Sequence, residues 1–201
     1  MNVLMKNIRS AGLLILLALI AQSCNDFLEE KPKDRTATDN FYVTAQDAVS
    51  AVNAIYAHLN SQSFDTFGGV YHSSFWVTIG LASDEMLNNQ AGQVSLDQLS
   101  SFTYGPDNAT VYDVWKQHYK AITLANIAIE RIPPIEMDET LKVRLLNEAK
   151  FLRGLLYFDL VRMFGRIPLV LKEIESTTPT VAEVDAIYSQ ILSDLTDAEN
   201  L

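Results

Sequence analysis

The longest helical pattern in the sequence covers residues 138–165, and its second half is apolar on nearly every side. From residue 151 to residue 164 most side chains are large and apolar, and the charged exceptions are Arg153, Asp159 and Arg162. A helix that is apolar all round is normally buried. We therefore expect this segment to lie at the centre of the fold, covered by other helices on several sides.

The ends of this helix and of an earlier one carry capping signals. Asp138 precedes the first turn and can accept hydrogen bonds from its amides, while Gly165 is the residue type that most often ends a helix. Thr44 and Asp47 have the spacing of a capping box, in which each side chain bonds to the backbone amide of the other residue. An amphipathic helix is therefore predicted from Thr44 to about Ser63.

Two further amphipathic segments complete two helical hairpins. Residues 108–132 carry one apolar face and end at Pro133, which blocks continuation. Asn126 is the polar residue on that face, and we expect it to bond to a neighbouring backbone group. Thr180 and Glu183 have the spacing of another capping box, followed by an amphipathic helix. Two consecutive hairpins predict an all-α fold of stacked, tetratricopeptide-like helix pairs, although the strict consensus of that repeat is absent.

Residues 64–106 lack a continuous helical pattern and form a long irregular loop region, with a short helix expected only at residues 77–87. Irregular regions of this length in compact domains usually have a function. Aromatic rings stack on the C–H face of a sugar, and amide side chains both donate to and accept from its hydroxyls. The alternative is that the aromatic residues fill the core and the amides form turns. The candidate ligand-binding residues are Trp76, Asn88, Asn89 and Tyr104.

The first 23 residues have the features of a secretory signal. Lys6 and Arg9 form a short basic region, and residues 11–21 are an apolar run that is too short to span a membrane. Cys24 is the only cysteine and directly follows Ser23, so this segment resembles a lipobox whose cysteine is acylated. The alternative is a plain secretory signal that ends beside an unpaired cysteine.

These features predict three parts of the chain. Residues 1–23 are expected to be a lipoprotein signal peptide, Cys24 the lipidation site, and residues 24–40 a polar tether between lipid and domain. The helical domain is expected to occupy residues 41–201. Its last amphipathic pattern still runs at Leu201, without a helix-ending Gly or Pro, so we expect the domain to be incomplete at its C-terminus.

Charge and residue spacing argue against several function classes. The formal net charge of −10 disfavours nucleic-acid binding, which needs a basic surface. His58, His72 and His118 do not have the spacing of a metal site, and we expect no metal and no cofactor. A glycosidase needs two opposed carboxylates, whereas the pair Asp84-Glu85 is adjacent in sequence and does not face one cleft. We therefore expect a protein that is not an enzyme.

Four stretches, spread over almost the whole chain, carry a family resemblance. They are NDFLEEKP after Ser23-Cys24, WKQHYKAITLANIAIERI, NEAKFLRGLLYFDLVRMFGRIPLVL and IYSQILSDLTDAENL. Together they resemble the N-terminal half of the SusD/RagB family of outer-membrane lipoproteins from Bacteroidetes. The third stretch, with its FLR, YFDLVRMFG and IPL elements, is the most specific part of the resemblance.

The resemblance implies a function that spacing alone does not show. Members of this family are tetratricopeptide-like lipoproteins on the outer face of the outer membrane. They bind oligosaccharides and pass them to a SusC-like TonB-dependent transporter, and they are not enzymes. Asp26, Glu29 and Glu30 look like the family's acidic export signal behind the lipidated cysteine. Family members also continue far beyond the position of Leu201. The alternative function is a helical-repeat adaptor on the outer membrane that binds only protein.

Overall fold

The computed structural model describes residues 41–60, 69–72, 74–173 and 178–199. The chain divides into two units, residues 1–40 and residues 41–201, of which only the second is described. The expected signal peptide, the Cys24 anchor, the acidic residues behind it and the tether therefore lie outside the described residues.

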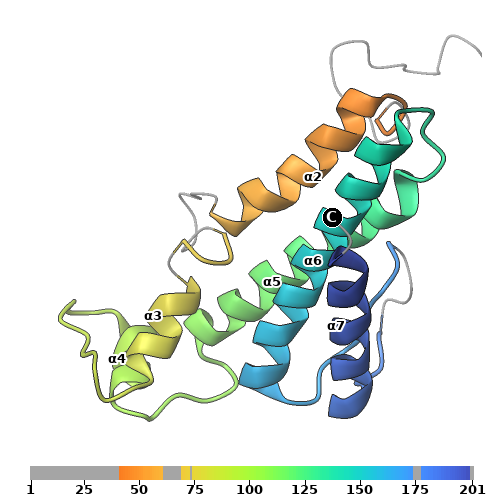
Figure 1. The fold of residues 1–201 in the computed structure, drawn as a ribbon. Helices are drawn as coiled ribbons and strands as arrows, with labels where there is room; N and C mark the ends of the chain where they lie inside the picture. Colours follow the sequence, from red (N-terminus) through yellow and green to blue (C-terminus); the bar gives the residue numbers. More distant parts are fainter. Residues whose placement is uncertain (1–40, 61–68, 73, 174–177, 200–201) are drawn as a thin grey trace, which may run out of the picture. The chain divides into compact units, whose positions relative to one another are not determined.

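Six α-helices make up the described part of the chain (Figure 1). They are α2 (Ala45–Leu59), α3 (Ser74–Leu81), α4 (Val94–Ser100), α5 (Ala109–Arg131), α6 (Glu139–Phe164) and α7 (Val184–Ala198). The extended segments around these helices meet in one isolated antiparallel bridge, between Pro168 and Val181. This arrangement confirms the predicted all-α class.

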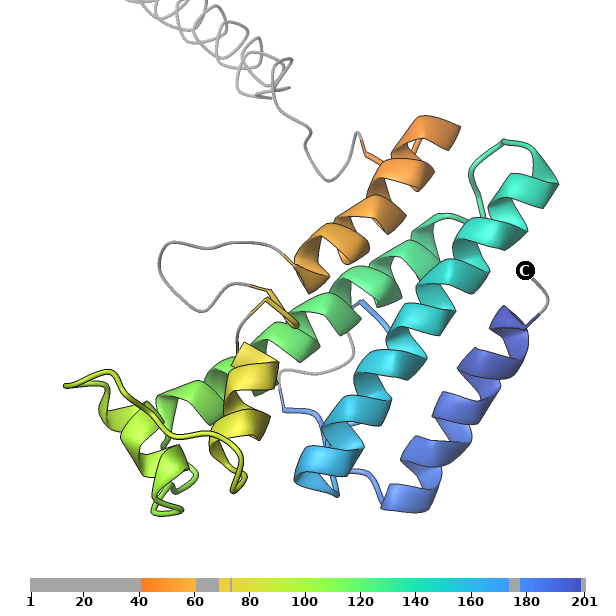
Figure 2. The same cartoon turned by 60° about the vertical axis from the view of Figure 1, so that its left-hand side comes forward.

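The helices pack as neighbouring pairs along the chain. α5 and α6 form an antiparallel hairpin, α2 packs against both of them, and α7 packs along α6 (Figure 2). The two short helices α3 and α4 lie at the N-terminal end of α5. None of the helices described is both long enough and apolar enough to cross a membrane.

Most of the predicted helix ends are confirmed. The Thr44–Asp47 capping box is present, and Asp138 accepts from the Leu141 amide at 2.8 Å. Gly165 ends α6 with a φ of 70°, a conformation that residues with a Cβ rarely adopt. The helix predicted to run to about Ser63 ends earlier, at Leu59.

The predicted capping box at Thr180 and Glu183 is wrong. Glu183 is itself the N-cap of α7, and its side chain makes no capping hydrogen bond. The reason is tertiary: Val181 forms the bridge with Pro168, and the Ala182 amide donates to the Ile167 carbonyl at 2.9 Å. These contacts hold residues 181 and 182 extended, so the helix begins only at Val184.

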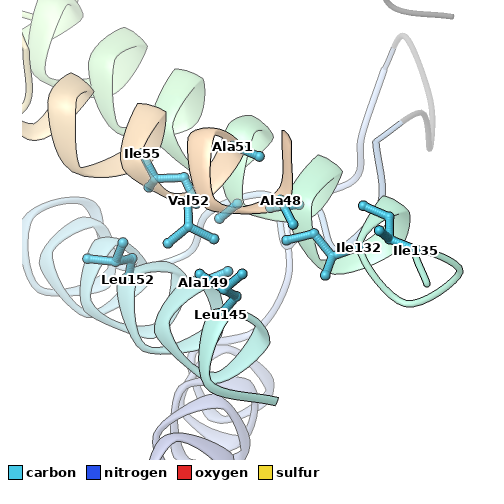
Figure 3. Close-up of a cluster of buried hydrophobic side chains, with 11 residues drawn as sticks. Ala48, Ala51, Val52, Ile55, Ile132, Ile135, Leu145, Ala149 and Leu152 are labelled. Atoms are coloured by element: carbon cyan, nitrogen blue, oxygen red, sulfur yellow. The ribbon is translucent and has the colours of Figure 1, made fainter. Parts of the chain in front are cut away.

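One core cluster lies where α2 packs against the α5–α6 hairpin. Ala48, Val52 and Ile55 of α2 face Leu145 and Leu152 of α6 (Figure 3), and all five side chains are buried. Small residues on both helices, including Ala149, allow this close packing. A second cluster, around Leu156, Leu160 and Ile187, joins α6 to α5 and α7.

The second half of α6 is covered by other helices on several sides, as its sequence predicts, and it is open on one side. Leu156, Tyr157 and Leu160 are fully buried, as expected for a central helix. Phe151 and Phe158, however, are 42% and 37% exposed, because α2, α5 and α7 leave that side of α6 uncovered within the described residues. The expected cover by other helices on several sides is therefore confirmed, and the side that carries Phe151 and Phe158 stays open.

A buried charged group on α6 pairs with a buried charged group on α7. The Arg153 guanidinium donates to both carboxylate oxygens of Asp194, at 2.8 and 2.7 Å. It also donates to Asn126 Oδ1 at 2.9 Å, and Asn126 Nδ2 donates to the Val170 carbonyl at 2.9 Å. The predicted backbone partner of Asn126 is thus confirmed, and one network ties α5, α6 and α7 together.

Candidate functional site

The region expected to be irregular, residues 64–106, contains two short helices. α3 begins at Ser74 and ends at Leu81, so the helix predicted at residues 77–87 has the wrong limits. Ser83 explains the early end: its hydroxyl donates to the Gly80 carbonyl at 2.6 Å and accepts from the Glu85 amide at 3.2 Å. A serine that bonds to nearby backbone in this way competes with helix continuation. Asp84 and Glu85 are exposed in the bend that follows.

Helix α4 is absent from the sequence prediction. It has only seven residues, and its buried side chains are Leu96 and Leu99. Two apolar positions are too few to establish a helical period. What holds α4 in place comes from outside the helix, since Leu96 and Leu99 pack with Leu81 of α3.

Asn108 joins α4 to α5. Its side-chain oxygen accepts from the amides of Thr110 and Val111, at 3.0 and 3.2 Å, which caps α5. Its side-chain nitrogen donates to the Ser95 carbonyl and to Gln98 Oε1, both at 2.9 Å. Asn108 is buried, so these four bonds satisfy side-chain atoms of Asn108 that water reaches poorly.

Two substitutions of Asn108 separate its two roles. Asn108→Ala removes the cap and both donors, and we expect it to lower the free energy of unfolding by about 2 kcal/mol or more. Asn108→Asp keeps an acceptor for the cap but loses the bonds to α4. In hydrogen exchange, both variants should expose the amides of α4, and only Asn108→Ala should also expose the first turn of α5. Equal protection of α4 in wild type and Asn108→Asp would contradict this role.

The four candidate ligand residues come from one region of the sequence, but they do not line one pocket. Trp76 is 52% exposed on α3, and its indole N–H donates to the His72 carbonyl at 2.8 Å. The Asn88 side-chain amide donates to Asp97 Oδ1 at 2.6 Å and to the Gln90 carbonyl at 3.1 Å. Asn89 is exposed in the same loop, and Tyr104 is exposed before α5.

Of these four residues, Tyr104 lines a cleft in the described part of the chain. The cleft has a volume of about 800 Å³ and lies between α3, the start of α5 and the end of α6. Its wall includes Tyr112 and Trp115 of α5 and Phe164 of α6, and it is mainly apolar. We call it the α3–α5–α6 cleft.

Sequence reasoning did not select Tyr112 and Trp115 as site residues. Trp115 lies on the predicted apolar face of α5, and its ring is held against Tyr119 and Phe164 with centroids 4.9 and 5.1 Å apart. Tyr112 is 62% exposed. Its place off the apolar stripe of residues 108–132 was the available signal, because a residue on the polar side of an amphipathic helix faces solvent.

The chemistry available in this region is that of non-covalent binding. Exposed aromatic faces at Trp76, Tyr104 and Tyr112 can stack on an apolar face of a ligand, and side-chain amides at residues 88–90 can bond to hydroxyl groups. Among the described residues, no group of three or more His, Cys, Asp or Glu side chains is arranged to hold a metal ion.

The comparisons with known proteins agree on one family. A family model described as "Starch-binding associating with outer membrane" matches residues 26–201. The SusD-like protein P2 of Formosa agariphila is 31% identical over 95% of this chain and 37% of its own length. A SusD-like protein of Bacteroides ovatus is 23% identical over 89% of this chain and 32% of its own length.

Solved structures show the same fold. A laminarin-binding SusD-like protein superposes with a TM-score of 0.66 and 26% identity, over 78% of this chain and 34% of its own. The surface glycan-binding protein A of Bacteroides fluxus gives a TM-score of 0.64 at 24% identity, over 78% of this chain and 33% of its own. The chain thus spans about a third of the length of these relatives. It belongs to the SusD/RagB family, of which it covers an N-terminal part.

Proposed function

We propose that the complete protein is an outer-membrane lipoprotein that binds oligosaccharides at the cell surface and passes them to a SusC-like TonB-dependent transporter. The observation that carries this proposal is the match of residues 26–201 to the family described as starch-binding and associated with the outer membrane. The laminarin-binding relative supports a glycan as the ligand class. In this proposal the protein carries out no covalent chemistry and is not an enzyme.

The exposed groups of residues 72–112 are suited to weak glycan binding. Trp76 and Tyr104 present aromatic faces to solvent from α3 and from the segment before α5. Asn88 is held in a fixed position by Asp97 and by its backbone bond to Ser100 Oγ at 3.1 Å. A rigid loop loses little conformational entropy when it binds, which favours affinity. We propose Trp76, Asn88, Asn89 and Tyr104 as ligand-contacting residues.

Calorimetry with the complete protein tests these four residues. Laminarin and soluble starch are the probes, chosen from the relatives' descriptions. The variant with all four residues changed to Ala should bind at least about thirtyfold more weakly, because truncating aromatic anchors costs about 2 kcal/mol or more. A matched control changes two exposed tyrosines on other helices, Tyr56 of α2 and Tyr188 of α7, to Ala. Unchanged affinity in the fourfold variant would show that the residues are wrong.

Two further experiments address the partner and the absence of catalysis. A pull-down from outer membranes should recover a large TonB-dependent β-barrel protein together with this lipoprotein. Recovery of other proteins, combined with no glycan binding, would instead favour the adaptor function. Incubation of the purified protein with laminarin or starch should release no reducing sugar, and measurable release would revive the enzyme hypothesis.

A further inference from the structure

A polar group of side chains lies where the turn of residues 69–72 meets α5 and α6. Tyr71 donates from its hydroxyl to Asp159 Oδ2 of α6, with the two oxygens 2.5 Å apart. His118 of α5 faces the same carboxylate, with its Nε2 atom 3.8 Å from Asp159 Oδ2. The other ring nitrogen of His118 lies 2.7 Å from the Val114 carbonyl, which sets the orientation of the ring.

Asp159 therefore has an unusual position for a carboxylate. It is buried on the central helix, and the groups around it are a tyrosine hydroxyl and a histidine ring. His118 Nε2 is buried too, and within the part of the chain that the structure describes it has no hydrogen-bond partner. Breaking the bond from Tyr71 would leave Asp159 without its short donor in a site poorly reached by water, which is costly.

The hydrogen bond from the Tyr71 hydroxyl to Asp159 fixes the turn of residues 69–72 as well as the Tyr71 side chain. The Tyr71 amide donates to the Leu59 carbonyl at 2.7 Å, and the Val70 amide donates to the His58 carbonyl at 3.2 Å. These two bonds attach residues 69–72 to the end of α2. The Tyr71 hydroxyl attaches the same turn to α6, 88 residues further along the chain. Burial and the carboxylate of Asp159 raise the pKa of Tyr71, so the hydroxyl remains a donor at physiological pH.

The turn of residues 69–72 also holds Trp76. The carbonyl of His72, the next residue after Tyr71, accepts the bond from the Trp76 indole N–H at 2.8 Å. Phe75, next to Trp76, packs edge-on against the Tyr71 ring with centroids 5.4 Å apart, and its ring lies 5.5 Å from that of His118. The exposed face of Trp76 is thus linked to the buried carboxylate through Tyr71 and one carbonyl group.

We propose that Tyr71 and Asp159 are positioning residues that fix the orientation of Trp76 for ligand binding. The expected effect of these residues on affinity rests on the proposed glycan-binding function, whereas their expected effect on the orientation of Trp76 does not. Neither residue is exposed enough to serve as a main contact for a glycan, so both act through the turn of residues 69–72.

Tyr71→Phe is the substitution that tests this role. It keeps the ring that packs on Phe75 and removes only the hydroxyl. Tyr119→Phe is a matched control, because Tyr119 is also half-buried and its hydroxyl donates one bond, to the Pro168 carbonyl at 2.7 Å. The Tyr119 hydroxyl bonds to the segment after α6 and not to the turn of residues 69–72, so a general loss of one buried hydroxyl bond should affect both variants alike.

The first readout is the indole N–H signal of Trp76 in ¹H–¹⁵N NMR spectra. The chain has two tryptophans, and Trp76→Phe assigns the signal. Tyr71→Phe should shift this signal and speed its exchange with solvent, whereas Tyr119→Phe should leave it unchanged. Asp159→Asn should shift it in the same direction. An unchanged Trp76 signal in Tyr71→Phe, or an equal shift in Tyr119→Phe, would overturn the positioning role.

The second readout is affinity for laminarin or soluble starch, measured by calorimetry on the complete protein. Tyr71→Phe should weaken binding by roughly tenfold, the factor at the lower end of what one hydrogen bond to a charged group contributes. A shifted indole signal with unchanged affinity would overturn the role of this contact in binding. If the wild-type protein binds neither glycan, the proposed function fails for these ligands, and the NMR result still decides the orientation of Trp76.

Discussion

Asp194→Ala is expected to lower the free energy of unfolding by about 3–5 kcal/mol, because it leaves the Arg153 guanidinium buried without its counter-charge. Both side chains are less than a tenth exposed, so water does not replace the lost carboxylate. The substitution also removes the acceptor of the Gln190 amide, 3.0 Å away. Chemical denaturation followed by far-ultraviolet circular dichroism measures the change.

A neighbouring ion pair provides the control. Asp197 lies on the same helix and pairs with Lys150 of α6 at 2.6 Å, but its side chain is half exposed. An exposed pair contributes at most about 1 kcal/mol, so Asp197→Ala should have a small effect. The two pairs join the same two helices and differ mainly in burial. Similar losses in the two variants would refute the argument that burial makes Asp194 important.

A double substitution distinguishes the cost of leaving Arg153 buried and unpaired from the cost of losing the ion pair itself. Replacing both Arg153 and Asp194 with apolar residues, as in Arg153→Met with Asp194→Leu, removes the unpaired charge. Much of the stability lost in Asp194→Ala should return, since apolar replacements of buried pairs are often neutral. The Asn126 oxygen would still lose its donor, so recovery should be incomplete. A double variant less stable than Asp194→Ala would contradict this account.

Cys24→Ser is expected to move nearly all of the protein from the membrane fraction to the soluble fraction. The change replaces one sulfur atom with oxygen and removes the thiol that the proposed acylation requires. Several acyl chains on one residue hold a protein stably, since each buried methylene contributes about 0.8 kcal/mol. Cell fractionation and metabolic labelling with a clickable palmitate analogue measure the effect.

The control for this experiment is Ser23→Ala, which keeps a small residue before Cys24 and leaves the thiol in place. This variant should remain membrane-bound and labelled. If Cys24→Ser stays in the membrane fraction, attachment does not depend on that cysteine. If it stays membrane-bound without label, the protein is held by another partner, and the lipid-anchor proposal is wrong.

The described helices differ in how far the sequence predicts them. α6 is long, and its start and stop depend on Asp138 and Gly165, which act on the backbone beside them. Such local signals remain valid whatever packs around the helix. α4 is short and depends on Asn108 and on apolar contacts with α3. The residues of α4 alone therefore do not predict this helix, which forms only when Asn108 and the apolar residues of α3 pack against it.

The candidate site shows the same division. Glycine and aromatic composition indicated residues 64–106 as the region to search, and Trp76 and Tyr104 are indeed exposed there. The sequence did not show that Tyr104 and Trp76 face different surroundings, or that Tyr112 and Trp115 line the cleft with Tyr104. Which aromatic residues share a surface depends on the packing of α3 against α5, and that packing is set by many weak contacts.

By itself, the sequence determined the all-α class, the extents of α5 and α6 and the family, because helical period, capping residues and motifs act locally. It also predicted a backbone partner for Asn126, but only the tertiary structure decided that this partner is Val170, 44 residues away. Only the tertiary structure decided that Arg153 and Asp159 are buried and that Tyr71 is linked to Asp159. It also decided that α7 begins at Val184 and not at the capping pattern before it. The physical reason is that a charged residue is buried only when a partner satisfies it, and these partners lie 41 and 88 residues away in the chain.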